Sequence, residues 1–570
     1  MSDAFVRSDH VSYFQQHGQV FAYHDLFGYL MGISPDVVEV LEQHLGAART
    51  RAEMELAFGD RFDRSAIREF LQVFTRFLFL VPPGTDELEA VWDTHPVRAR
   101  WTVYHQPAPD SLTFWLTDRR GSSRAESPPA WAARLWHSID GEASVRQLHA
   151  GIGEDVEPGE LLATVASWVR HDRQVLRLSS LPVSLLGPEH QWPAYLLSSM
   201  PYAPWRPGID PVPDDPLDRV GEPVNPPHAY YAEEVRDAAR RFDEVETTLS
   251  HVFRRPHPAL GGASFGEALV DALVDGGRLS EATADIVELG GGHGDLAAGA
   301  LAYVRELLPA TYEGLTYTII DLSPALRTAQ EATLAAAGIE PGRVRWVTAN
   351  AEALPAAPSS ADLILSNEVI GDLTAVKLTR ELLDAPPSDN EPEAVRSFRA
   401  HGLPHAGAPD DGFYYNLGAV KLVEWVAAAL RPGGSAYISE YGGLGRWPVP
   451  ATHLDHIEVS IHFGHLAHVA KQLALEVEVE PLLDLFPFDF EAPMLATTRS
   501  WFLSLRALLA SRNLALEKVA YTRAMMLDLL GSALPIDEIG DLRFNPLNER
   551  CMGLKPHEFH ALLLRKPTRA

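Results

Sequence analysis

The chain has almost no cysteine, with Cys551 as the single thiol among 570 residues. One thiol cannot form an internal disulfide, so a disulfide-stapled secreted fold is excluded and a reducing compartment is favoured. No apolar run is long enough to cross a membrane, and the first residues, Met1–Arg7, contain no apolar signal core. These absences predict a cytoplasmic protein without a membrane partner.

Positive charge is also scarce. Lys and Arg number 48 against 77 Asp and Glu, which gives a formal net charge of −29. Such a surface repels the phosphates of nucleic acids, so a nucleic acid partner is not expected. It would attract a basic peptide. A chain of this length is expected to contain two to four domains.

The most informative stretch is Ile-Val-Glu-Leu-Gly-Gly-Gly-His-Gly at residues 286–294. An apolar run that ends at Glu288 and continues into glycines predicts a buried parallel strand, a tight turn and a helix start. A dinucleotide fingerprint would need its third glycine where Asp295 stands. The spacing acidic-x-Gly-x-Gly-x-Gly is instead typical of S-adenosylmethionine (SAM)-dependent methyltransferases.

Further strand and turn signals follow in the order that is typical of a SAM-binding α/β domain. Asp321 ends a second predicted strand, separated from Gly294 by enough chain for one helix, and a carboxylate there can accept both ribose hydroxyls. Predicted strands at 344–348, 361–365 and 435–439 come next. We therefore expect a Rossmann-like α/β class I methyltransferase fold with a mixed seven-stranded sheet and SAM as cofactor. The predicted cofactor-binding residues lie at or just after strand ends: Glu288, Gly290, Gly291, Gly292, Gly294, Asp321, Leu322, Asn350, Ala351, Glu352 and Asn367.

Three segments carry a resemblance to a known family. Ser264-Phe-Gly-Glu-Ala-Leu, the glycine turn and Ser366-Asn-Glu-Val-Ile-Gly-Asp-Leu are similar to the MidA family, which includes the mitochondrial complex I assembly methyltransferase. The sequence departs from the family at two places. Asp372 stands one position later than the family's Asp, and Ser460 and His462 stand where the family has His and Asp. Family members methylate protein arginine, so the resemblance implies a protein or peptide substrate and an arginine nitrogen as acceptor.

The candidate catalytic residues gather around the end of the fourth strand. Glu368, beside Asn367, can hold a guanidinium by paired hydrogen bonds, although the same pair could simply brace a loop. Asp372 and Glu440 are second-rank candidates, and His462 could act as a general base.

Several histidines crowd residues 453–468. A spacing of i, i+3, i+6 on a helix spreads side chains around the surface, so no metal is expected.

Residues 1–182 are predicted to form a duplicated unit, with modules at 1–92 and 93–182. The pair Ser34-Pro35 recurs as Ser127-Pro128, and each pair stands between β-prone stretches and three predicted helices. This order favours tandem small α+β winged-helix-like modules. A DNA-binding winged helix is the competing interpretation, but neither copy has a basic recognition helix.

The first copy resembles the PqqD-like modules that bind leader peptides of ribosomally made, post-translationally modified peptides (RiPPs). The residues that carry the resemblance are Tyr23-His-Asp-Leu-Phe-Gly-Tyr-Leu-Met-Gly-Ile-Ser-Pro. The resemblance implies that a peptide adds as a strand to a sheet edge, against the third helix. Arg64, Arg68 and Arg76 could then meet acidic leader residues, or they could form an ordinary solvated face.

The composition of the chain predicts the remaining domain boundaries. A proline-rich linker is predicted at 183–228 and the methyltransferase domain at 229–570, with a helix at 233–253. A polar insertion at 384–412 could be a substrate lid or a disordered loop.

The leading hypothesis is a SAM-dependent methyltransferase of a precursor peptide recruited through its leader, with an arginine nitrogen as the favoured acceptor. The alternatives are a methyltransferase of a folded protein or a small metabolite, and a scaffold that binds SAM without catalysis. The expected partner is the precursor peptide, and a second copy of the chain is an open alternative.

Overall fold

The computed structural model describes residues 4–16, 18–59, 62–99, 101–118, 121–152, 156–186, 202–225, 252–253, 256–453, 456–496, 499–517, 520–540, 542–546 and 558–568. The chain divides into two compact units. Unit 1 comprises residues 1–215, 497–516 and 527–542, and unit 2 comprises residues 216–496, 517–526 and 543–570. The predicted helix at 233–253 and Cys551 fall largely or wholly outside the described residues. No helix in the described residues is long and apolar enough to span a membrane.

Unit 2 is built on one mixed sheet. Its strands lie side by side in the order β15 (Val344–Thr348), β14 (Thr316–Asp321), β13 (Asp285–Leu289), β16 (Ala361–Asn367), β19 (Leu430–Gly443), β26 (Phe559–Arg565) and β23 (Glu476–Pro481). The first five strands run parallel, and β26 is antiparallel to both of its neighbours. A short strand, β22 (Ile461–His462), pairs with the end of β19. The predicted mixed seven-stranded α/β sheet is therefore confirmed, with β22 as an addition.

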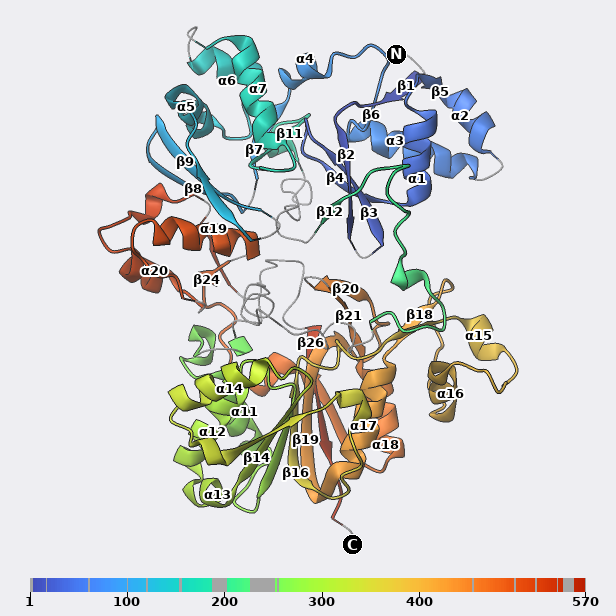
Figure 1. The fold of residues 1–570 in the computed structure, drawn as a ribbon, viewed down its shortest axis with the longest axis vertical. Coiled ribbons are helices and arrows are strands. Elements are labelled where there is room, and N and C mark those ends of the chain that lie inside the picture. The colour runs from blue at the N-terminus through green and yellow to red at the C-terminus, as the bar shows by residue number, and fades with distance from the viewer. Residues whose placement is uncertain are drawn as a thin grey trace. The chain divides into compact units, whose positions relative to one another are not determined.

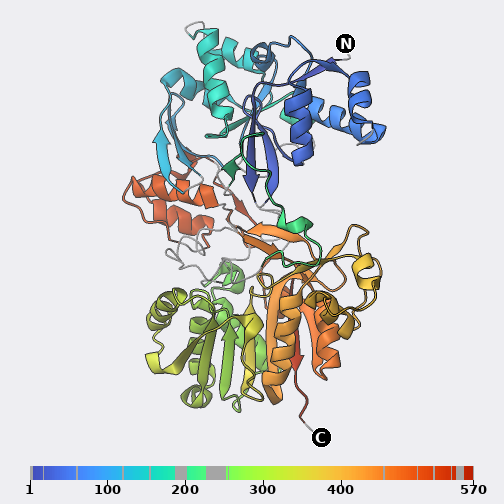
Figure 2. The same ribbon diagram turned by 45° about the vertical axis from the view of Figure 1, so that its right-hand side comes forward.

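Helices cover both faces of this sheet, as Figures 1 and 2 show. Apolar side chains of β13 point to both faces of the sheet, so both faces need a cover. Ile286 belongs to one apolar core, and Leu289 belongs to the core on the opposite face. The first core is completed by α11 (Phe265–Asp275), α12 (Asp295–Leu307), α13 (Pro309–Gly314) and α14 (Leu326–Ala336). The second is completed by α17 (Leu417–Ala429) and α18 (Phe463–Gln472).

Unit 1 contains two segments with the same order of elements. The first has a leading strand, a three-stranded antiparallel meander, three helical segments and a closing strand: β1 (Ala4–Arg7), β2 (Val11–Gln16), β3 (Gln19–His24), β4 (Leu30–Ile33), α1 (Pro35–Glu39) running into a π-helical turn (Val40–His44), α2 (Arg51–Phe58), α3 (Arg64–Arg76) and β6 (Leu80–Val81). The closing strand pairs antiparallel with the leading strand, which also meets β5 (Arg49–Thr50).

The second segment repeats this order after a connecting helix, α4 (Glu87–Val91). It runs through β7 (His95–Arg98), β8 (Val103–Ala108), β9 (Ser111–Thr117), β10 (Ser123–Glu126), α5 (Ala130–Ser138), α6 (Val145–Ile152), α7 (Pro158–Val169) and β11 (Leu176–Ser179). Here too the closing strand pairs antiparallel with the leading strand. The repeated order agrees with the predicted strands and helices, while the winged-helix-like and PqqD-like interpretations stay predictions.

The turn between β3 and β4 joins the two segments. Leu26 and Phe27 are buried in the core of the second segment, and the Tyr23 hydroxyl donates to the carbonyl oxygen of Val169. Asp25 accepts hydrogen bonds from the backbone and ring of His171. Part of the motif that carries the PqqD-like resemblance therefore holds the two segments together.

A helix from the C-terminal third of the chain completes unit 1. Helix α19 (Arg499–Ala510) packs against β9, β10 and β8, and Figure 1 shows it beside β8 and β9. The hydroxyl groups of Ser504 and Thr117 are 2.7 Å apart across this contact. The predicted 229–570 domain thus contains residues that group with unit 1. Helix α20 (Arg523–Leu530) runs across the boundary between the units.

The predicted insertion at 384–412 contains regular structure. It follows β17 (Val376–Leu378) and α15 (Arg380–Asp384), includes α16 (Glu393–Ala400) and leads into β18 (Phe413–Tyr415), which pairs with β17. Phe398 and Leu403 are buried in the second core of unit 2. The alternative of a disordered loop is therefore wrong, because apolar side chains hidden in a polar stretch anchor the segment. Strands β20 (Pro450–His453) and β21 (His456–Val459) form a hairpin, and β24 (Met494–Leu495) pairs antiparallel with the sequence-distant β25 (Phe544–Asn545).

Candidate functional site

The glycine turn between β13 and α12 needs glycine at several of its positions. Gly290, Gly292 and Gly294 have φ angles of 72°, 48° and 86°, in the left-handed region that favours glycine. A Cβ atom on Gly290 would overlap the Val369 side chain, which follows the end of β16. The turn therefore leaves its backbone amides close to the carboxyl ends of the strands, as a bound SAM requires.

Asp321 lies directly beside this turn. One carboxylate oxygen accepts the Ser323 amide at 2.9 Å, and the other accepts Nε2 of Gln330 at 3.2 Å. Burial raises the pKa of Asp321, and the amides of Gly291 and Gly292 act in the opposite sense. The carboxylate predicted for the ribose is thus held at the edge of the glycine turn.

Gln330 was missed by sequence reasoning. Its buried side chain also donates to the carbonyl oxygen of Gly292, at 3.1 Å, so it ties Asp321 to the turn. Its Oε1 is buried and has no hydrogen-bond partner among the described residues. The sequence carries no signal for this role, because Gln330 is one polar residue within helix α14.

Glu288 points into the core instead of the turn. It is 1% exposed and accepts the Tyr317 hydroxyl at 2.8 Å. Burial raises the pKa of Glu288 to about 8, so its carboxyl group is mostly protonated at pH 7. Its predicted contact with the cofactor stays a prediction.

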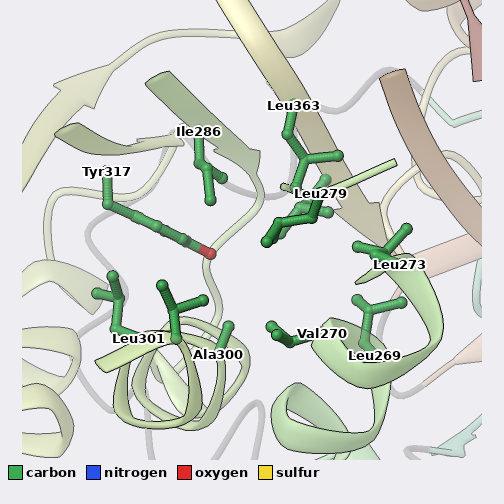
Figure 3. A pocket seen from close by; sticks show the side chains of 11 residues that line it. Leu269, Val270, Leu273, Leu279, Ile286, Ala300, Leu301, Tyr317 and Leu363 are labelled. Atoms are coloured by element: carbon green, nitrogen blue, oxygen red, sulfur yellow. The ribbon is translucent and has the colours of Figure 1, made fainter. Parts of the chain in front are cut away.

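A small cavity lies on the same side of the sheet (Figure 3). Its lining is aliphatic except for Tyr317, and it comes from α11, α12 and strands β13, β14 and β16. The lining offers no charged group to a polar cofactor. This cavity is a packing space in the first core.

The predicted cofactor-binding residues after β15 form a local cap. The Asn350 side chain accepts the Glu352 amide at 2.9 Å and begins a 3-10 turn, Ala351–Ala353. Glu352 in turn binds the backbone amide and, at 2.9 Å, the hydroxyl of Thr374. Glu352 therefore fixes the loop after β16. Contacts of Leu322, Asn350, Ala351 and Glu352 with the cofactor stay predictions.

Glu368 stands in an uncommon backbone conformation. Its φ angle is 52°, in the left-handed region that side chains other than glycine rarely adopt, and such positions cluster at functional sites. Its amide donates to the carbonyl oxygen of Ser439 at 3.0 Å. The neighbouring Asn367 accepts the Ser439 hydroxyl at 2.8 Å. Strand β19 thus holds the pair at the end of β16.

Glu440 joins Glu368 in an acidic cluster. Glu440 is buried, and its two carboxylate oxygens accept the amides of Gly371 and Tyr441 at 3.0 and 2.9 Å. Burial raises the pKa of Glu440 well above its usual range, and the charges of Glu368 and Glu458 raise it further. We call Glu368, Glu440 and Glu458 the acidic cluster.

Glu458 was not among the predicted residues. It lies on β21, and only the fold brings it near the ends of β16 and β19. Asp372 lies in the loop after Glu368, where its amide donates to the carbonyl oxygen of Val369 at 3.2 Å.

His462 caps a helix. Its Nδ1 accepts the His465 amide at 3.2 Å at the start of α18, and the two rings stack with centroids 3.8 Å apart. Burial lowers the pKa of both rings, that of His465 to about 4, so both are neutral at pH 7. In the part of the chain that the structure describes, no group of three or more His, Cys, Asp or Glu residues could hold a metal ion.

Comparisons with known proteins bear on unit 2. Residues 266–389 match the family described as "Putative S-adenosyl-L-methionine-dependent methyltransferase". An uncharacterised protein from Burkholderia thailandensis is 20% identical over 60% of this chain and 88% of its own, with a TM-score of 0.32. A second solved structure from that organism, a "likely methyl transferase" bound to S-adenosyl-homocysteine, is 17% identical over the same shares, with a TM-score of 0.31. A comparison with curated proteins gives no match.

The matched segment contains the glycine turn, Asp321 and Glu368, and it supplies strands β15, β14, β13 and β16 of the sheet described above. The chain is therefore a SAM-dependent methyltransferase, and SAM is its cofactor.

Proposed function

We propose that the chain methylates a nitrogen of a cationic side chain, with arginine favoured, in a ribosomally made precursor peptide that it recruits through the leader. The observation that carries the acceptor class is the acidic cluster, which gathers three carboxylates where β16 and β19 end. Three buried or half-buried carboxylates repel one another unless a cation or protons neutralise them. A guanidinium supplies that charge.

The cluster also suits the chemistry. Bound SAM supplies an electrophilic methyl group, so the protein has to orient the nitrogen and exclude water. A planar guanidinium can donate paired hydrogen bonds to carboxylates, which fixes its orientation. An ionised carboxylate of the cluster can accept the proton that the methylated nitrogen must lose.

Recruitment of the leader is supported by the first segment of unit 1. Its sheet has the order β12-β2-β3-β4, where β12 (Ala203–Pro204) comes from the predicted linker. The linker thus occupies one edge, while no strand of the described residues pairs with the outer side of β4. An open edge can accept an extended peptide as an additional strand. Arg64 and Arg68 on α3 are exposed.

The acceptor class is tested by methyl transfer from labelled SAM to arginine-, lysine- and glutamine-containing peptides. We expect transfer to the arginine peptide, with a loss of about ten- to a hundredfold in kcat/KM for Glu458→Gln, because a hydrogen bond to a charged group contributes about 1.5–3 kcal/mol. Glu313→Gln, which removes an exposed carboxylate from α13, is the matched control. Transfer to the glutamine peptide alone, or unchanged turnover in Glu458→Gln, would contradict the proposal.

The leader is tested with the full-length chain and short peptides encoded beside its gene. We expect fluorescence anisotropy to detect binding of one such peptide, and Arg68→Glu to weaken it at least about tenfold through charge reversal. Arg345→Glu, on the exposed edge of β15, should leave binding unchanged. If no neighbouring peptide binds, a folded protein or a metabolite becomes the better substrate.

A further inference from the structure

The last described residues of the linker contact β17 and the end of the loop before it, the loop that begins at Glu368. The amide of Gly221 donates to the carbonyl oxygen of Lys377 at 2.8 Å, and the amide of Val224 donates to that of Ala375 at 3.0 Å. Residues 220 and 223 form single β-bridges with β17. The linker therefore runs in unit 2 as an extended segment beside β17, held by isolated bridges and backbone hydrogen bonds.

Asn225 ends this segment inside the protein. It is 8% exposed, and its amide group makes three hydrogen bonds to the backbone of residues 371–375. Nδ2 donates to the carbonyl oxygens of Gly371 at 3.3 Å and Leu373 at 3.1 Å, and Oδ1 accepts the Ala375 amide at 2.8 Å. One side chain thus satisfies three backbone groups of a loop, which fixes the path of that loop.

Gly371 connects this contact with the acidic cluster. Its amide donates to Glu440, and its carbonyl oxygen accepts Nδ2 of Asn225 and, at 3.0 Å, the amide of Val459. Val459 follows Glu458 on β21, and Gly371 follows Glu368 in the same loop. A Cβ atom on Gly371 would lie 3.1 Å from the Glu440 carboxylate, so the approach is close. Gly371 is therefore the point at which the segments bearing the three carboxylates meet.

We infer that Asn225 is a positioning residue for the methyl acceptor: it holds Gly371, and through Gly371 the carboxylates of the acidic cluster. The inference rests on the proposed function for the identity of the acceptor, and on the hydrogen bonds alone for the positioning. The hydrogen bonds of the Asn225 side chain all go to the loop after β16 and none to the described residues of the glycine turn or to Asp321. Its loss should therefore affect the acceptor and leave the cofactor in place.

The test compares Asn225→Ala and Asn225→Asp with wild type in the full chain. Asn225→Asp keeps the acceptor for the Ala375 amide but turns a carboxylate toward the carbonyl oxygens of Gly371 and Leu373. The variant therefore separates the effect of accepting from Ala375 from the effect of donating to Gly371 and Leu373. Lys566→Met is the control, because it removes two hydrogen bonds, to Ala427 and Leu430, at the start of β19, whereas Glu440 lies near the end of that strand. Thermal unfolding verifies that each variant is folded.

Three readouts are measured. We expect the affinity for S-adenosyl-homocysteine to stay within about twofold in calorimetry, and kcat/KM for the peptide acceptor to fall at least about tenfold through a raised KM. In hydrogen exchange, the amides of Gly371 and Ala375 should exchange at least about tenfold faster in Asn225→Ala, and only that of Gly371 in Asn225→Asp. Lys566→Met should change none of these.

The exchange measurement needs no acceptor, so it tests the positioning even if the wild type methylates no arginine peptide. Unchanged exchange at Gly371 would overturn the inference. Equal losses in cofactor affinity and acceptor kcat/KM would overturn it as well, because they indicate a general structural role. If exchange rises as expected but the wild type transfers methyl groups only to an uncharged acceptor, the proposed function fails and the positioning role stands.

Discussion

At the scale of single residues, the Glu288 carboxyl group gives a pH-dependent stability. Its folded pKa, about 8, lies above the ordinary value of 4.5, so the folded state binds the proton more tightly than the unfolded chain. The stabilisation that this proton contributes is complete below about pH 4.5 and is lost as the pH rises through about 8.

Glu288→Gln removes this titration while keeping the shape and a hydrogen-bond acceptor for Tyr317. We expect the difference in Tm between the variant and wild type to shift in favour of the variant between pH 5.5 and pH 8.5. Scanning calorimetry at both values measures it. A difference that is independent of pH would show that Glu288 does not titrate in this range.

Residues that sequence reasoning missed share a physical feature. Gln330, Glu458 and Asn225 act through partners that lie far away in the sequence, so no local spacing reveals them. The glycine turn, Asp321 and Glu368 were predicted because a strand end followed by a turn has a local signature. Glu288 shares that signature, yet the alternation of side chains along β13 turns it toward the core.

At the scale of elements, prediction depended on apolar periodicity. The strand at 344–348 has the predicted bounds, because it carries a clear apolar pattern. Helix α16 went unpredicted because its apolar residues lie between charged ones in a stretch rich in proline and aspartate. The pairing of β12 with β2 and of residues 220–225 with β17 was equally hidden, since proline-rich composition indicates only an extended chain.

Helix α19 allows a test of its assignment to unit 1. Trp501 is fully buried, and its ring meets that of Trp101 edge to face at 6.5 Å. Trp501→Ala should cost about 3–5 kcal/mol of stability, because it leaves a large cavity. We expect hydrogen exchange to accelerate in β8–β10 while binding of S-adenosyl-homocysteine persists. Faster exchange confined to unit 2 would contradict the grouping of α19 with unit 1.

At the scale of the whole molecule, the net charge of −29 predicts how the substrate binds. Screening shortens from about 10 Å at 0.1 M salt to about 3 Å at 1 M, so long-range attraction of a basic peptide weakens. The KM for an arginine peptide should therefore rise with salt, while the affinity for S-adenosyl-homocysteine, which carries no net charge, changes little. A KM that is independent of salt would show that the enzyme recognises the peptide through short-range contacts alone.

The grouping of residues 497–516 and 527–542 with residues 1–215 has a consequence for synthesis. A ribosome releases the strands β8, β9 and β10 long before it releases the helix that covers them, because most of unit 2 is encoded between the two. During this interval, which lasts roughly 20–80 seconds at about 5–20 residues per second, the apolar surface that α19 will cover stays open to water. The nascent chain therefore needs a chaperone or a temporary internal cover over this surface until its C-terminal third emerges.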